Sequence, residues 1–110
     1  MTTVWYHVRD LAAARAFYVQ KLGFTETASN EGERWLTLAR DGAAVGLAEG
    51  DPQADGAVAL VDVSDVKRVA EGLRARGVDV GVVLELHGAM RLLDVFDPDG
   101  NRLQFAEELS

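Results

Sequence analysis

Cysteine is absent from the 110-residue chain, and proline and histidine each occur only twice. The lack of cysteine excludes disulfide bonds, thiolate catalysis and cysteine-ligated zinc. It also suits a reducing compartment, so we expect a cytoplasmic protein. The first ten residues lack the basic and apolar regions of a signal peptide. No apolar stretch is long enough to cross a bilayer, so we expect no membrane partner.

Basic residues are also in deficit. The chain has 18 Asp and Glu residues against 11 Lys and Arg residues, which gives a formal net charge of −7 at pH 7. Such a surface repels phosphate backbones, so we expect no nucleic-acid partner. The charge favours a cationic small molecule or serves solubility alone, and solubility accounts for most of it.

What is present is an ordinary globular composition, with 48% hydrophobic and 26% charged residues. The length fits one domain, residues 1–110, with a core of modest size. Within this domain two segments follow the same plan. Each begins with a short apolar run typical of a strand and continues with an aspartate, Asp10 or Asp65, at the start of a helical pattern. Gly23 and Gly77 follow as helix stops.

Three strand-like segments follow each predicted helix, at residues 24–29, 34–40 and 43–49 in the first half and 78–86, 90–96 and 102–107 in the second. The last two segments of each half are joined by an Asp-Gly turn, at 40–42 and 97–101. The polar residues 51–55 are expected to link a first module, residues 1–50, to a second, residues 56–110. The sequence therefore predicts an α+β fold. Two βαβββ modules form a curved mixed sheet around a cavity, with the helices on the outer face.

Two motifs carry a family resemblance. The stretch HVRDLAAARAFYVQKLGF, from His7, resembles the first strand and helix of the vicinal-oxygen-chelate superfamily, which contains glyoxalases, bleomycin-resistance proteins and dioxygenases. The stretch VFDPDGNRLQF, from Val95, resembles the last hairpin of that superfamily. The resemblance covers nearly the whole chain. It implies paired βαβββ modules and a homodimer with cavities formed partly at the interface.

The enzymes of that superfamily hold one divalent metal ion with four side chains, two from each module. The resemblance places these positions on Thr3, Gly46, Val58 and Gln104. Glycine and valine offer no ligand atom, and threonine and glutamine are weak neutral donors. We therefore expect no metal ion and no other cofactor.

Strand alternation predicts which side chains face the cavity. The candidate ligand-binding residues are Trp5, His7, Trp35, Thr37, Gly46, Leu60, Asp62 and Gln104. The two tryptophans could stack on a flat or cationic ligand, or could simply fill the concave face or a dimer interface. Gln104 could offer a donor and an acceptor to a ligand, or could bond to neighbouring strands.

His7 and Asp62 occupy equivalent places in the two modules. As a pair they could grip a polar ligand group, form a structural hydrogen bond, or act as an acid/base pair if the protein is an enzyme. Binding ranks first of these. We assign no catalytic residue otherwise. A shifted metal site of His7, Asp62 and His87 would require His87 to fold inward from a turn.

Three functions follow from these features. The first is a metal-free protein that binds a small molecule, as the bleomycin-resistance branch does. The second is a lyase, isomerase or dioxygenase that uses a shifted metal site or the His7–Asp62 pair. The third is an interaction module with a vestigial cavity, since fold alone does not supply function.

Overall fold

The computed structural model describes residues 3–53 and 56–109. The first module contains β1 (Thr3–Val8), α1 (Leu11–Ala16), the π-helical turn η1 (Phe17–Lys21), β2 (Thr25–Asn30), β3 (Trp35–Arg40) and β4 (Ala43–Glu49). The second contains β5 (Ala59–Asp62), α2 (Val66–Ala75), β6 (Leu84–Leu86), β7 (Met90–Phe96) and β8 (Arg102–Glu108). None of the helices in these two ranges has the length and hydrophobicity that a bilayer span requires.

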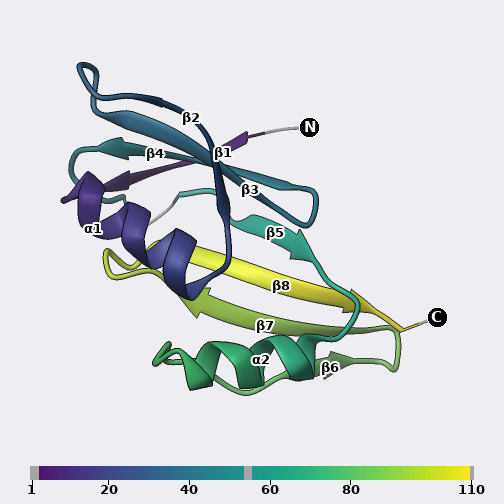
Figure 1. The fold of residues 1–110 in the computed structure, drawn as a ribbon. Helices are drawn as coiled ribbons and strands as arrows, with labels where there is room; N and C mark the ends of the chain where they lie inside the picture. The colour runs from purple at the N-terminus through teal and green to yellow at the C-terminus, as the bar shows by residue number, and fades with distance from the viewer. Residues whose placement is uncertain (1–2, 54–55, 110) are drawn as a thin grey trace.

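The two modules repeat one topology. The first sheet has the strand order β1-β4-β3-β2, and the second has the equivalent order β5-β8-β7-β6. In each sheet the first strand of the module pairs in parallel with the last, and the remaining pairs are antiparallel. Figure 1 shows the first module, in purple and blue, above the second, in green and yellow, with β5 at the boundary. The α+β class and the duplicated βαβββ plan are confirmed.

The predicted helix signals form as expected. The Asp10 carboxylate accepts a hydrogen bond from the Ala13 N–H at 3.2 Å, and Asp65 accepts one from the Arg68 N–H at 3.1 Å. Both aspartates therefore cap helix N-termini. Gly23 and Gly77 have φ angles of +77° and +81°, the left-handed backbone that glycine adopts without strain at a helix end.

One predicted strand is much shorter than expected. Of residues 78–86, only Leu84–Leu86 form a strand, and Val80 makes an isolated bridge to Val95. Val78 is buried in the core, whereas Val82 is 82% exposed. The apolar run thus divides between core and surface instead of lying on one sheet. The predicted linker, residues 51–55, includes two positions, 54 and 55, that lie outside the described residues.

The two modules share one hydrophobic core on the helix side of the sheets. Tyr6 and Val8 of β1 are buried, while the intervening His7 is only partly so. Alternation of this kind sends every second side chain to the core. The largest fully buried side chains come from both modules: Tyr18, Leu22, Leu36, Leu38, Leu47, Leu73, Leu93, Leu103 and Phe105.

Two tyrosines connect the modules by hydrogen bonds. The Tyr6 hydroxyl accepts a hydrogen bond from the Ala59 N–H at 2.8 Å and donates to the Arg102 carbonyl. The Tyr18 hydroxyl donates to the buried Asp97 carboxylate at 2.8 Å. Burial is the main cause that raises the pKa of both hydroxyls above the ordinary tyrosine value, so both keep their protons.

Removal of the Tyr6 hydroxyl would leave the buried Ala59 N–H without an acceptor. We expect Tyr6→Phe to lower the free energy of unfolding by about 1–3 kcal/mol, measured by urea denaturation. Tyr18→Phe is the matched comparison. Asp97 would still accept hydrogen bonds from Asp99 and Asn101, so the loss should be smaller. A larger loss for Tyr18→Phe would contradict this assignment.

Candidate functional site

The face of the first sheet that points away from the helices carries the predicted aromatic surface. Trp5 of β1 is 48% exposed, although its neighbour Tyr6 is only 3% exposed. Register pairs Trp5 with Gly46 of β4, and Gly46 with Thr37 of β3. These three residues form one row across the sheet, and the next row contains His7, Ala48 and Trp35.

The indole ring of Trp5 packs on Gly46. A Cβ atom added at Gly46 would lie 2.4 Å from two ring carbons of Trp5, a distance that real Cβ contacts do not reach. The indole therefore packs directly on the glycine backbone. Trp35 meets Trp5 edge to face, with ring centroids 6.1 Å apart and an interplanar angle of 77°. Edge-to-face pairing is a favoured aromatic geometry, so the two indoles hold one another in place.

His7 and Asp62 belong to different sheets. His7 is paired with Ala48 and lies close to the backbone at Gly50, where an added Cβ would be 3.1 Å from its ring. Asp62 is exposed and paired with Ala106. Within the described part of the chain no hydrogen bond joins the two side chains. Their predicted partnership stays a prediction, and each would have to act through a ligand that spans the two.

The open face of the second sheet carries a polar trio. The Gln104 side-chain amide donates to Asp94 Oδ1 at 3.1 Å, and Arg102 Nε lies 3.1 Å from the same oxygen. Leu60 is 49% exposed and is paired with Gln104 across the parallel strands. The trio borders a cavity of about 360 Å³ that is also lined by Gly81, Val82, Leu84, Leu86 and Leu92.

The contact between Asp94 and Gln104 was not predicted from the sequence. Its signal was present in the hairpin. Asp94 is paired with Gln104 in the antiparallel register of β7 and β8, so the two side chains share a face. Once the turn at Asp97–Asn101 is placed, this pairing follows by counting outward along both strands.

The four positions that would hold the superfamily metal ion do not fit a metal. Gly46 has no side chain, and the space above it is filled by Trp5. Val58 has no donor atom, and Gln104 offers only a neutral amide oxygen. Threonine at position 3 is a poor ligand for a transition ion. This donor set contains none of the imidazole or carboxylate ligands that such a site needs.

The shifted alternative is also not assembled. His87 has a φ angle of +51° and is exposed in the turn between β6 and β7. In residues 3–53 and 56–109, no three His, Asp or Glu side chains are grouped closely enough to hold an ion. His7, Asp62 and His87 therefore do not form a ligand set.

Glu49, at the end of β4, joins the start of α1 to the segment before β3. Its carboxylate accepts hydrogen bonds from Arg34 Nη2 at 2.6 Å and from the Leu11 N–H at 3.1 Å. The hydrogen bond from Arg34 is the main cause that lowers the pKa of Glu49. The stabilisation from these bonds is present above the ordinary glutamate pKa and is lost as pH falls through the lowered value.

A family model described as Glyoxalase/Bleomycin resistance protein/Dioxygenase superfamily matches residues 2–105. No curated protein matches the chain. An antibiotic binding protein from Streptomyces sp. CB03234 has a similar structure, with a TM-score of 0.74, 26% identity, and coverage of 98% of this chain and 96% of that chain.

Two further solved structures share the fold at lower identity. A bleomycin-binding protein from Streptomyces verticillus, complexed with copper(II)-bleomycin, has a TM-score of 0.76 and 20% identity, and the match covers 94% of this chain and 92% of that one. A lactoylglutathione lyase from Agrobacterium tumefaciens has a TM-score of 0.79 and 18% identity, with coverage of 97% and 92%. The fold thus occurs in binding proteins and in an enzyme.

The packing of Trp5 on Gly46 can be tested by adding a methyl group at position 46. Gly46→Ala should displace the indole, lower the free energy of unfolding by about 1–3 kcal/mol and shift tryptophan emission to longer wavelength. Gly72→Ala is the matched control, because an added Cβ there meets nothing within 4 Å. Because alanine favours the helix more than glycine does, Gly72→Ala should raise the free energy of unfolding by about 0.5–1 kcal/mol. Unchanged emission in Gly46→Ala would show that Trp5 is not seated on Gly46.

Proposed function

The chain belongs to the Glyoxalase/Bleomycin resistance protein/Dioxygenase superfamily, and we propose that it binds a flat, partly aromatic small molecule without a metal ion. The observation that carries the proposal is the packing of Trp5 on Gly46 and against Trp35. The indole is half exposed, packed on Gly46 and braced edge to face by Trp35. A large aromatic surface held rigid and open to solvent is suited to stacking, because little side-chain freedom is lost on binding.

The acidic character of the chain favours a ligand with cationic character. Asp62 is exposed at the end of β5 in the second sheet. The formal net charge of −7 adds a long-range attraction for cations. Planar cations also bind well against tryptophan faces. Two structural neighbours are an antibiotic binding protein and a bleomycin-binding protein, which supports a natural product as ligand.

Each candidate ligand-binding residue has a role in this proposal. Trp5 and Trp35 stack on the ligand, Thr37 lies beside them, and Gly46 acts by supporting the Trp5 ring. His7, Asp62 and Gln104 supply polar contacts, and Leu60 supplies an apolar one. The cytoplasmic location that the lack of cysteine favours is part of the same proposal.

We also infer that the protein acts as a homodimer. The second module exposes several large apolar side chains: Val58, Leu60, Val82, Leu84, Leu86 and Phe96. Val82, Leu84 and Leu86 line the cavity of about 360 Å³, and Val58 and Phe96 line another recess. Exposed apolar side chains that gather on one module mark an interaction site. A second copy of the chain would cover these side chains and narrow the open cavities.

The two tryptophans should dominate ligand affinity. In calorimetric titrations with bleomycin and with planar cationic dyes, Trp5→Ala and Trp35→Ala should each weaken the best binder by about tenfold or more, since an aromatic stacking contact contributes about 0.5–1.5 kcal/mol beyond area burial. Val19→Ala is the control, because this apolar side chain is 39% exposed but lies in η1, on the helix side of the sheets. Equal weakening by all three variants, or by none, would remove the aromatic face as the site.

The metal content of the purified protein distinguishes a metal-free binding protein from a metal-dependent enzyme of the superfamily. Protein dialysed against nickel, zinc, manganese, cobalt and ferrous ions and then gel filtered should retain no stoichiometric ion, because the donor set at Thr3, Gly46, Val58 and Gln104 cannot hold one. Elemental mass spectrometry gives the ratio directly. A retained ion that is lost in a His7→Ala variant would instead favour the superfamily's enzymatic chemistry.

A further inference from the structure

A second recess lies away from the aromatic face, between the two modules on the helix side. It encloses about 320 Å³ and is lined by the β3–β4 turn, the segment before α2 and one face of α2. We name it the arginine groove. Its lining residues are Arg40, Asp41, Val63, Ser64, Asp65, Arg68, Val69, Gly72, Leu73 and Arg76. A wider hollow of about 700 Å³ adjoins it and shares Arg40, Asp41 and Arg76.

The groove concentrates positive charge in an acidic protein. Three of the 11 basic residues line it, although the chain as a whole carries a formal charge of −7. Two of the three guanidinium groups border the same point. A Cβ atom added at Gly23 would lie 3.6 Å from Arg40 Nη1 and 3.7 Å from Arg76 Nη1. Gly23 lines the wider hollow, so these two guanidinium groups lie where the hollow and the groove adjoin.

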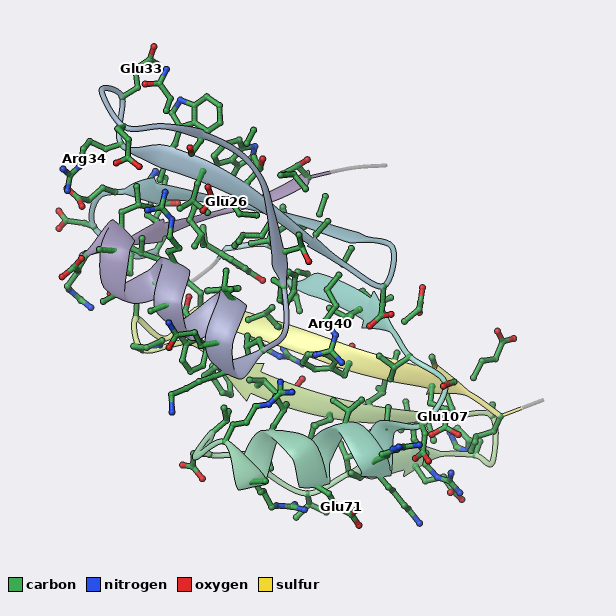
Figure 2. The ribbon with its side chains drawn as sticks, in the orientation of Figure 1. Glu26, Glu33, Arg34, Arg40, Glu71 and Glu107 are labelled. Atoms are coloured by element: carbon green, nitrogen blue, oxygen red, sulfur yellow. The ribbon has the colours of Figure 1, made fainter. Side chains whose placement is uncertain are left out.

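Both guanidinium groups are held in place by other contacts. Arg40 Nε donates to Asp41 at 2.9 Å, its Nη1 donates to the Leu22 carbonyl, and the group stacks 5.0 Å from the centroid of Phe105. Figure 2 shows Arg40 reaching from the first module toward β8. Arg76 Nη1 donates to the Lys21 carbonyl at 3.2 Å. These contacts orient the groups before any ligand arrives.

Donor capacity remains after these contacts are made. Among the described residues, no hydrogen bond uses Nη2 of Arg40 or Arg76, or any guanidinium nitrogen of Arg68. The two acids of the lining are already engaged, because Asp41 pairs with Arg40 and Asp65 caps α2. An arginine fork with free N–H groups is suited to a carboxylate or a phosphate.

We propose that the arginine groove binds a small organic anion, with its carboxylate or phosphate group held between Arg40 and Arg76. Arg68 lines the same groove and adds a third cation. The apolar part of the anion lies on Val63, Val69 and Leu73, side chains that are partly or fully buried. The volume is that of a small-molecule site, so a compact ligand fits better than a peptide. Since the arginines come from both modules, the bound anion would also join them.

Phenyl phosphate is the probe, because it combines an oxyanion with one apolar ring. Calorimetry at 20 mM salt should show binding that Arg76→Gln weakens at least tenfold. Arg68→Gln, which removes no hydrogen bond, should also weaken it. Lys67→Gln is the matched control, because it removes one charge from the same helix outside the groove. Inorganic phosphate should bind less tightly than phenyl phosphate, because it lacks the ring. Circular dichroism confirms that each variant folds.

The site is located by amide chemical shifts. Phenyl phosphate should perturb residues 22–23, 40–42 and 63–76, and leave Trp5 and Trp35 unchanged. Three results would each overturn the proposal: no binding to the wild-type protein, equal weakening by Lys67→Gln and Arg76→Gln, or shifts confined to the tryptophan face. Tighter binding of an acidic peptide than of phenyl phosphate would overturn it as well, and would reassign the groove to a protein partner.

Discussion

The Tyr6 hydroxyl joins the two modules by bonding to backbone groups of the second. β5 is the outermost strand of its sheet, so one of its edges has no partner strand there. A buried N–H at such an edge is costly if it has no partner. The phenol accepts from the Ala59 N–H and donates to the Arg102 carbonyl, and in this way one side chain replaces part of a missing ladder. The shared core and both open faces depend on that junction.

The aromatic face depends on a different constraint, which is that position 46 has no Cβ atom. The superfamily resemblance places a ligand position at Gly46 on β4, and the space above this glycine is filled by Trp5. A side chain at position 46 and the present position of the Trp5 ring are thus mutually exclusive. In the second sheet the equivalent pairing joins Leu60 to Gln104, whose amide is bonded to Asp94. The same scaffold position therefore carries an aromatic surface in one module and a polar trio in the other.

Local signals were enough to predict most of the fold. Asp10 and Asp65, followed by Gly23 and Gly77, marked both helices, and the Asp-Gly turns fixed the hairpins. The face of Trp5 and Trp35 followed from alternation. The division of residues 78–86 did not, because an apolar run does not reveal which of its residues meets the core. The arginine groove was also missed, since Arg40 and Arg76 lie far apart in sequence and meet only when the modules pack.

The repeated register has an evolutionary consequence. Trp5 opposite Gly46 and Leu60 opposite Gln104 occupy matching slots in two copies of one supersecondary unit, each with its own sheet. A substitution in one slot alters one open face while the other module keeps its strands and helix. The repeated unit therefore gives this small chain two positions where ligand recognition can change separately.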